Sequence, residues 1–373
     1  MPVLIYLVGS LLAFANGAND NFKGVATLLG TGTTSYRGAL LWTTIATGIG
    51  SAAALILARG LLAAFSGKGL VPPEVVSNPG FPLAVAASAG ATVMLATRFG
   101  FPVSTTHALI GALVGAGLIA SPDGVDFHRL GRGFLLPLLT SPFIAILLSA
   151  GLYPPLRFLR SRLGVEQETC ICIENEVVGV VPGNPGPELA LQAIGLPTLK
   201  IGPEVTCTVR YRGRVAGISA RSLLDISHFL SAGVVSFARG LNDTPKIAAL
   251  LLVGGLFSPS VAIVAVGVAI AIGGLTSARR VAETMSYRVT DMNPGQGFTA
   301  NVVTGVLVVG ASVLGVPVST THVSCGSLFG IGTVTRRAHG NTIRQILLAW
   351  VTTLPVAAVL ASLFLVVFQV FVR

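Results

Sequence analysis

Two copies of an asparagine–aspartate pair followed by a lysine lie in otherwise apolar stretches of this chain. The first copy is FANGANDNFKGVATLL, from Phe14, and the second is FARGLNDTPKIAALLL, from Phe237. Their polar residues are Asn19, Asp20 and Lys23 in the first copy and Asn242, Asp243 and Lys246 in the second. In each copy the aspartate precedes the lysine by three residues, so the two side chains share one face of a helix and can form an ion pair.

Charged groups at these positions are costly if the two stretches cross a bilayer. A charge at the bilayer centre costs about 2.5–3.5 kcal/mol. The structural alternative is that each pair only fixes two helices together, but buried ion pairs are weak sources of stability. Gly17 and Gly240, just ahead of the pairs, favour local unwinding of both helices, and the freed backbone carbonyls are typical cation ligands. We therefore predict that both copies line a binding site.

A second repeated motif, PVSTTH, occurs at Pro102–His107 and at Pro317–His322. In each copy the proline ends one helical arm, and a serine or threonine then caps a new helix that runs toward Ala120 or Gly330. The simpler interpretation is that the hydroxyls only satisfy the free N–H groups of that first turn. If the two copies enter the membrane from opposite faces, however, two helix N-termini meet at its middle and can hold an anion. The hydroxyls involved are those of Ser104, Thr105, Thr106, Ser319, Thr320 and Thr321.

Three further polar residues lie beside these motifs. His107 and His322 end the two PVSTTH copies, and we interpret them as partners that orient the hairpin tips, as proton carriers, or as simple caps of a carbonyl. Arg239 precedes the second asparagine–aspartate pair and matches Asn16 of the first copy, so it has no basic counterpart there. We expect Arg239 to gate the site or to hold an anion.

The composition predicts a protein that lies in a lipid bilayer. Of the 373 residues, 52% are hydrophobic and only 10% are charged, and the mean hydropathy is +0.81, whereas a soluble domain carries about 25% charged residues. Apolar runs long enough to cross about 30 Å of hydrocarbon are predicted at Val3–Gly32, Ala39–Leu57, Leu130–Tyr153, Leu223–Leu252, Val261–Leu275 and Ile343–Val372. Two shorter pairs, each interrupted by a PVSTTH copy, are predicted at Leu83–Ala96 with Val103–Ala120 and at Phe298–Val313 with Thr320–Gly330.

The formal net charge of +10 is explained by topology rather than by a nucleic-acid partner. With the N-terminus outside, the predicted cytoplasmic loops hold 15 of the 24 Lys and Arg residues, and the outer loops hold five. This distribution follows the positive-inside rule. Both termini are therefore expected outside a plasma or inner membrane. The basic residues left at membrane depth or at a hairpin tip are Lys23, Arg98, Arg239 and Lys246.

The two copies of both motifs divide the chain into two related halves. Each half has an odd number of predicted crossings, so the second is inserted upside down relative to the first, as in secondary transporters with interrupted helices. We therefore predict an all-α polytopic membrane protein with two inverted repeats, at residues 1–162 and 221–373. Residues 163–220 contain alternating stretches such as TCICIENEVV and are predicted to form a small β-rich cytoplasmic insertion.

At these residues the chain resembles the PiT family of inorganic phosphate transporters, over both halves and so over nearly all of the chain outside the central insertion. GANDN, GLNDT and the two PVSTTH segments carry the resemblance. It implies phosphate uptake driven by a sodium ion or proton gradient, without a cofactor, usually by a homodimer in the lipid bilayer. It also implies that Asn19, Asp20, Asn242 and Asp243 line the site and hold the coupling ion, with sodium at the two aspartates as the one metal expected, and that the hairpin hydroxyls complete the site.

The chain departs from the family where VANA is usual, because it has NFKG and TPKI there. Lys23 and Lys246 are predicted phosphate ligands, and an ammonium beside each aspartate can also take the place of a sodium ion. Since lysines favour any divalent anion, a sulfate permease is the alternative within the family. The carboxylates favour phosphate, because they accept a hydrogen bond from its proton and sulfate has none to offer.

Other classes of protein fit the sequence less well. A channel needs a continuous polar pore, whereas the polar residues here are concentrated at mid-membrane, and a phosphate sensor that reports through the insertion is the other alternative. The spans carry no His-Glu metal pattern, serine–base pair or nucleotide-binding loop, so we do not expect an enzyme.

Overall fold

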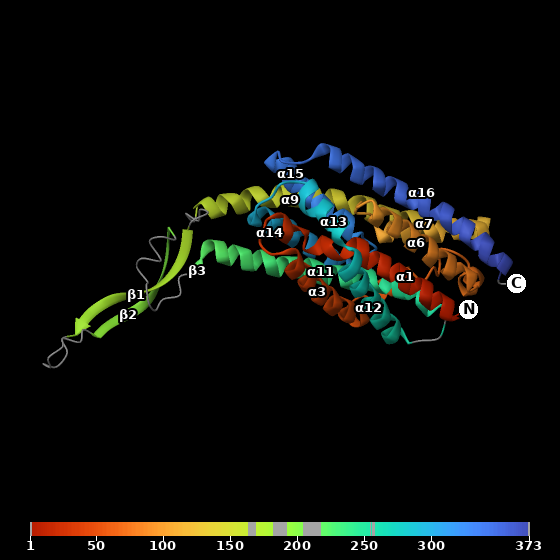
Figure 1. Ribbon diagram of the computed structural model, residues 1–373, viewed down its shortest axis with the longest axis horizontal. Helices are drawn as coiled ribbons and strands as arrows, with labels where there is room; N and C mark the ends of the chain where they lie inside the picture. Colours follow the sequence, from red (N-terminus) through yellow and green to blue (C-terminus); the bar gives the residue numbers. More distant parts are fainter. Residues whose placement is uncertain are drawn as a thin grey trace. The chain divides into compact units, whose positions relative to one another are not determined.

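The computed structural model describes residues 2–162, 169–181, 192–203, 218–253, 255 and 258–371. The chain forms two compact units, one of Met1–Gly151 with His228–Arg373 and one of Leu152–Ser227. The larger unit is a bundle of helices, and the smaller unit contains the β-strands (Figure 1). The repeat boundaries expected at residues 162 and 221 stay predictions.

The helices follow one another along both halves of the chain (Figure 1). Those of the first half are α1 (Pro2–Asp20), η1 (Asn21–Gly24), α2 (Ala26–Gly30), α3 (Tyr36–Leu57), α4 (Arg59–Ala64), α5 (Pro73–Ser77), α6 (Gly80–Arg98), α7 (Thr105–Ala120), η2 (Pro122–Gly124), α8 (Phe127–Arg129), the π-helical turn η3 (Leu130–Leu135) and α9 (Leu136–Arg162). Those of the second half are α11 (Ala220–Leu252), α12 (Pro259–Ser277), α13 (Arg279–Glu283), the π-helical turn η4 (Thr284–Arg288), α14 (Pro294–Val313), α15 (Thr320–Thr335) and α16 (Gly340–Phe371).

Seven stretches of helix in the described part of the chain are long and apolar enough to cross a membrane. They are Val3–Gly24, Tyr36–Leu57, Gly80–Arg98, Phe127–Leu159, Pro259–Ser277, Pro294–Val313 and Gly340–Gln369. Large apolar side chains face outward from them, such as Leu147 and Val351, which are 71% and 73% exposed. A surface of this kind is stable in lipid rather than in water. The chain is therefore a multi-pass membrane protein, as its composition predicts.

The first asparagine–aspartate pair lies where a helix ends. α1 ends at Asp20, and the chain continues as the tighter turn η1 before α2 begins at Ala26. Val25, between η1 and α2, has φ −118° and ψ 7°, which is outside the α-helical region. The predicted interruption is therefore present in the first half.

The second pair, in contrast, lies inside a continuous helix. α11 runs unbroken through Asp243 and Pro245, so the predicted unwinding beside Gly240 is wrong. Pro245 has no N–H group and cannot donate to the carbonyl of Leu241, four residues earlier. The proline thus releases a carbonyl from the helical hydrogen-bond pattern while the helix itself continues.

Both PVSTTH segments connect one helix to the next, α6 to α7 and α14 to α15. The Ser104 Oγ accepts a hydrogen bond from the backbone N–H of His107 at 3.1 Å. The Ser319 Oγ accepts the equivalent bond from the N–H of His322 at 3.2 Å. The predicted serine caps are therefore confirmed, and each fixes the start of a helix that follows a proline-containing turn.

Glycines allow helices of the two halves to approach closely. A Cβ atom at Gly17 of α1 would collide with the backbone carbonyl of Ile270 in α12. One at Gly240 of α11 would collide with the backbone carbonyl of Thr47 in α3. The two contacts are equivalent in the alignment of the repeats, so each motif-bearing helix packs against a helix from the other half.

The strands of the smaller unit are β1 (Thr169–Val181), β2 (Gln192–Pro203) and β3 (Ile218–Ser219), in the order β2-β1-β3. β1 pairs with both neighbours in the antiparallel direction, and its pairing with β2 shifts register between Val177 and Gly179. That this segment is an insertion on the cytoplasmic side stays a prediction.

Candidate functional site

The Asp20 carboxylate lies in a buried polar cluster. Its Oδ1 pairs with the Lys23 Nζ and accepts a hydrogen bond from the Thr321 Oγ1 at 3.1 Å. Its Oδ2 accepts hydrogen bonds from the Asn16 Nδ2 and from the Thr105 Oγ1, both at 2.8 Å. Asp20 is only 1% exposed. Side chains from the end of α1 and from the first turns of α7 and α15 therefore meet at one carboxylate.

The Asp243 carboxylate has an equivalent but looser set of neighbours. Its Oδ1 accepts a hydrogen bond from the Asn242 Nδ2 at 2.9 Å and lies 3.6 Å from the Lys246 Nζ. Its Oδ2 accepts a hydrogen bond from the Thr320 Oγ1 at 3.4 Å and lies 3.9 Å from the Arg239 Nε. The second aspartate thus has longer contacts to its cations than the first.

The hairpin hydroxyls divide into two groups. The hydroxyls of four threonines reach the charged cluster: Thr105, Thr106, Thr320 and Thr321. The hydroxyls of Ser104 and Ser319 accept backbone N–H bonds within the first turn of their own helices. For the two serines the structure therefore shows the simpler capping interpretation. Phosphate binding by any of the six hydroxyls stays a prediction.

Each lysine contacts a hairpin of the opposite half. The Lys23 Nζ donates to the Thr321 Oγ1 at 2.7 Å, and the Lys246 Nζ donates to the Thr106 Oγ1 at 2.8 Å. Lys23 and Lys246 occupy equivalent positions in the two halves, and so do Thr106 and Thr321, so the two contacts are equivalent. The motifs that the sequence separates by more than 70 residues thus form a single site.

The two predicted asparagines hold the hairpin backbones. The Asn19 Oδ1 accepts a hydrogen bond from the Val103 N–H at 3.1 Å, and its Nδ2 donates to the Phe101 carbonyl at 3.0 Å. The Asn242 Nδ2 donates to the Val318 carbonyl at 3.2 Å. These contacts fix the proline-containing turns beside the two aspartates.

Arg239 and Asn16 connect the two halves directly. The Arg239 guanidinium donates to the Asn16 Oδ1 at 2.8 Å and to the Asn21 Oδ1 at 2.9 Å. Its Nε is buried and has no hydrogen-bond partner among the described residues. Sequence reasoning noted Asn16 only as the match of Arg239 and missed its place in the site. The signal was its position four residues before Asp20, which sets both side chains on one helix face.

The two histidines join the hairpins to α16. The rings of His107 and His322 lie 4.2 Å apart between centroids, and the His322 ring stacks on Trp350 at 3.8 Å. The Trp350 Nε1 donates to the Pro102 carbonyl at 3.1 Å. These contacts fit the predicted role in orienting the hairpin tips, and that role stays a prediction.

The charges of the cluster do not cancel. Three basic side chains and two carboxylates are each at most 4% exposed: Lys23, Arg239, Lys246, Asp20 and Asp243. In their ordinary ionised forms they carry a formal charge of +1. Taking charges out of water is costly unless other charges and hydrogen bonds compensate. A cluster with one uncompensated positive charge and several hydroxyl donors suits a bound anion.

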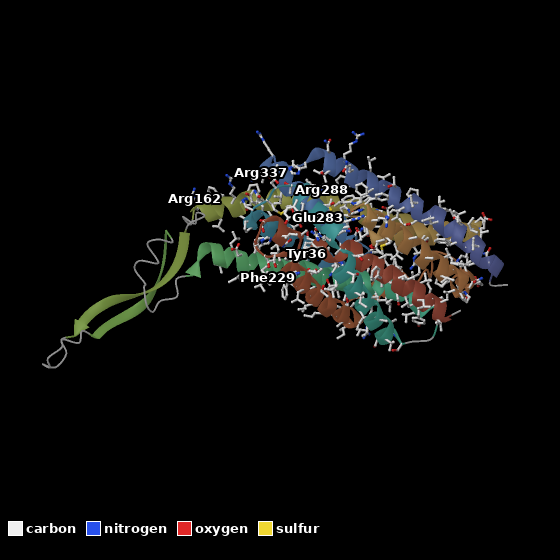
Figure 2. The ribbon with its side chains drawn as sticks, in the orientation of Figure 1. Tyr36, Arg162, Phe229, Glu283, Arg288 and Arg337 are labelled. Carbon is white, nitrogen blue, oxygen red and sulfur yellow. The ribbon has the colours of Figure 1, made fainter. Side chains whose placement is uncertain are left out.

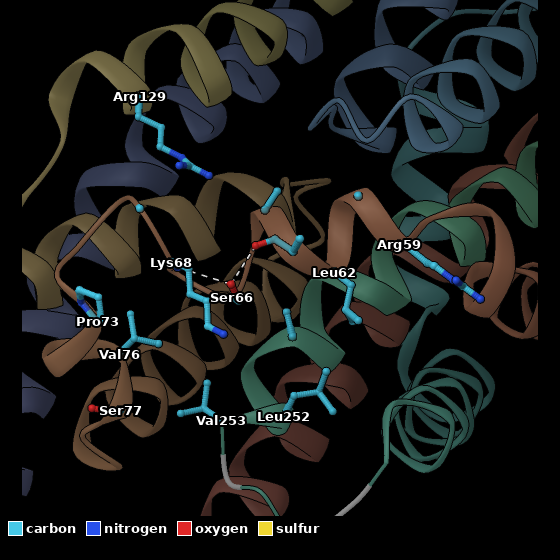
Figure 3. A pocket seen from close by; sticks show the side chains of 15 residues that line it. Arg59, Leu62, Ser66, Lys68, Pro73, Val76, Ser77, Arg129, Leu252 and Val253 are labelled. Atoms are coloured by element: carbon cyan, nitrogen blue, oxygen red, sulfur yellow. Dashed lines mark hydrogen bonds between the residues drawn. The ribbon is translucent and has the colours of Figure 1, made fainter.

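A pocket of about 1080 Å³ lies near this cluster, at the end of α11 (Figure 3). Its lining includes Arg59 of α4, Lys68 of the following loop and Arg129 of α8. Phe65 lies in the chain between two lining residues, and its buried ring is 5.6 Å from the Lys246 Nζ. Ala249, which also lines the pocket, lies three residues after Lys246 on α11, so the pocket is close to the second half of the cluster. Sequence reasoning assigned these basic residues only to outer loops.

The proteins to which this chain is similar are named as phosphate transporters or permeases. The model of the phosphate transporter family matches residues 16–361. A protein of Pyrococcus horikoshii, whose name describes it as a candidate phosphate permease, is 28% identical over 395 residues, which cover 97% of this chain and 96% of that protein. The chloroplastic inorganic phosphate transporter 2-1 of Arabidopsis thaliana is 26% identical over 431 residues, covering 97% of this chain and 71% of that protein.

A solved structure, that of "the sodium-dependent phosphate transporter", has the same fold. It superposes with a TM-score of 0.75 at 20% sequence identity and covers 99% of both chains. The matching family and the named relatives are transporters rather than enzymes. Since the family model spans both motif pairs and nearly the whole length of the protein, the chain belongs to the phosphate transporter family.

Proposed function

We propose that this protein imports inorganic phosphate by secondary active transport, with a sodium ion or proton gradient as the energy source. The observation that carries the proposal is the convergence of both asparagine–aspartate pairs and both hairpin tips on one buried cluster of net positive charge. Phosphate would bind among the threonine hydroxyls and basic side chains, with the asparagines and serines holding the backbone around it.

The contacts also support two repeats inserted in opposite directions. Each lysine contacts a threonine of the opposite half, and each of the two glycines packs against a helix of the opposite half. The contacts made by one half are equivalent to those made by the other. In addition, α1 runs away from the end marked N, whereas α11 runs toward that end (Figure 1). Alternating exposure of a central site through movement of two such repeats is the usual mechanism of secondary transporters.

The basic pocket supports a route to the site from one side. Arg59, Lys68 and Arg129 would attract an anion into this pocket, whose lining residue Ala249 lies one helical turn after Lys246 on α11. We propose that this side faces the outside of a plasma or inner membrane, with both termini there. A homodimer with one path in each protomer is part of the same proposal.

Sulfate is the alternative substrate, because the cluster carries a net positive charge. The two carboxylates favour phosphate, since each can accept a hydrogen bond from a protonated phosphate oxygen and would repel sulfate. The aspartates are therefore the residues on which the choice between the two anions depends.

The proposal is tested by uptake of labelled phosphate into proteoliposomes, with excess sulfate as competitor and with sodium and proton gradients imposed separately. We expect uptake that sulfate inhibits weakly. Asp20→Asn and Asp243→Asn should each lower it at least tenfold, because breaking a buried charge pair removes about 3–5 kcal/mol of favourable interaction.

Asp291→Asn is the matched control, because this aspartate is exposed and lies 3.6 Å from the His339 Nε2 at the surface. It should transport phosphate like the parent protein. Normal uptake by both cluster variants would contradict the site, and labelled sulfate uptake that exceeds phosphate uptake would favour the sulfate permease.

A further inference from the structure

The ammonium group of Lys23 lies inside a shell of four oxygen atoms. It donates to the Asn19 Oδ1 at 2.8 Å, to the Val103 carbonyl at 2.8 Å and to the Thr321 Oγ1 at 2.7 Å. The fourth oxygen is the paired Asp20 Oδ1. Amide, carbonyl, hydroxyl and carboxylate oxygens are the ligands that hard cations take in proteins.

Lys246 has the matching shell in the other half. Its Nζ donates to the Val318 carbonyl at 2.7 Å and to the Thr106 Oγ1 at 2.8 Å, and it lies 3.6 Å from the Asp243 Oδ1. Each shell therefore combines a carbonyl from its own hairpin, a hydroxyl from the opposite hairpin and an aspartate. Because the same kinds of oxygen atom surround the equivalent lysine in each half, the surroundings are specific for a cation and are not a chance contact.

The N–H donors of Lys23 are all used within the protein. An ammonium has three N–H donors and no acceptor, whereas four oxygens lie within hydrogen-bonding distance of this one. The Lys23 side chain is also only 3% exposed. All of its donors are thus engaged by the protein, so Lys23 contributes positive charge rather than a free N–H group.

We propose that Lys23 and Lys246 fill two alkali-cation sites, so that the chain carries covalently the charges that a sodium-coupled transporter would take from solution. Sodium is then not bound at either aspartate, and phosphate uptake does not depend on a sodium gradient. The inference rests on the proposed function, because it states which ion is excluded from coupling at that site.

The test measures thermal unfolding of the purified, detergent-solubilised protein in NaCl, KCl and choline chloride at equal ionic strength and without phosphate. The parent protein should have the same Tm in all three salts. Lys23→Ala removes the ammonium and leaves the four oxygens, so its Tm should fall in choline and recover with increasing NaCl but not KCl. A ligand that binds only the folded state raises its stability in this way.

Lys246→Ala applies the same test to the second shell. Lys23→Met is the isosteric control, because its side chain fills the space without a charge; its Tm should fall and sodium should not restore it. Lys68→Ala removes an exposed lysine outside the cluster and should show neither effect.

A sodium-specific rise in the Tm of the parent protein would overturn the inference. So would alanine variants that are folded but indifferent to sodium, or that fail to fold even in NaCl. These measurements need no transport, so they stand if the protein proves not to carry phosphate. Conversely, if phosphate uptake by the parent protein requires sodium, the proposal that the lysines fill the cation sites is contradicted, whereas the proposed phosphate transport is not.

Discussion

Arg239 breaks the equivalence of the two halves at the level of single residues. The repeat alignment places Asn16 opposite it, and the two side chains bond each other at 2.8 Å. The guanidinium is 1% exposed, and with its charge the cluster reaches a formal +1. Because one asparagine replaces the second arginine, the cluster avoids a still larger uncompensated charge.

Arg239→Met should raise the KM for phosphate at least tenfold, because the cluster then becomes formally neutral. Two charge-assisted hydrogen bonds, to Asn16 and Asn21, are lost as well, and each contributes about 1.5–3 kcal/mol. Initial rates of labelled phosphate uptake at varied phosphate concentration measure the effect, with protein content in the liposomes determined in parallel.

Arg279→Met is the control for this change. Arg279 forms an exposed ion pair with Glu283 at 3.2 Å, and exposed pairs contribute about 0–1 kcal/mol. Its KM should stay within about twofold of the parent value. Equal KM values for the two variants would rule out a role of the buried arginine in holding the anion.

Residue types alone predicted the aspartates, the lysines and the threonines that meet in the cluster. They did not reveal Asn16 or Asn21, because a single asparagine in an apolar helix has no fixed partner until the opposite helix is placed. Nor did they separate the two serines from the neighbouring threonines. That difference depends on which hydroxyls point back along the first helical turn.

At the scale of helices, contact between α3 and α11 depends on a glycine that has no room for a side chain. A Cβ at Gly50 would collide with the backbone carbonyl of Phe237, whereas one at Gly48 of the same helix would have no heavy atom of the described structure within 4 Å. The two glycines are therefore a matched pair for testing the packing.

Gly50→Ala should destabilise the protein by about 1–3 kcal/mol, as is typical when extra atoms are forced into a packed interface. Gly48→Ala should stabilise it by up to about 1 kcal/mol, because alanine has the higher helix propensity. Thermal unfolding in detergent measures both. A lower Tm for Gly48→Ala than for Gly50→Ala would contradict the close approach of α3 and α11.

The helix termini illustrate which features of an element can be read from sequence. The serine after each Pro-Val predicted the starts of α7 and α15 correctly, because a cap acts within a single turn. The break at Gly240 was predicted from the glycine just ahead of the asparagine–aspartate pair and is absent from α11. There Gly240 serves the contact with α3 instead, and a contact between distant helices is not visible in a local pattern.

At the scale of the whole molecule, two exposed arginines lie toward one end of the helical unit. Arg288 and Arg337 are exposed and lie toward the same end in Figure 2, whereas α1 begins and α16 ends at the other (Figure 1). Positive charge on the cytoplasmic side is the rule for membrane proteins. This rule supports the proposed orientation, in which the pocket with Lys68 faces the outside.

This orientation is tested with single cysteines in a background that lacks the four native ones. Lys68→Cys should react with a membrane-impermeant maleimide in intact cells, because Lys68 is exposed and the proposed orientation places it outside. Arg337→Cys should react only after the membrane is permeabilised. The opposite labelling pattern would reverse the proposed orientation.

The exchange of contacts between the halves also constrains the order of assembly. α1 and η1 leave the ribosome first, yet two residues that they contact are synthesised much later: Thr321, which bonds both Asp20 and Lys23, and Ile270 of α12, which packs against Gly17. During translation Asp20 and Lys23 are therefore expected to lack their hydrogen bonds to Thr321 until the second half of the chain has been inserted. Neither half is expected to be stable when expressed alone, whereas the two halves produced together as separate chains should complement each other.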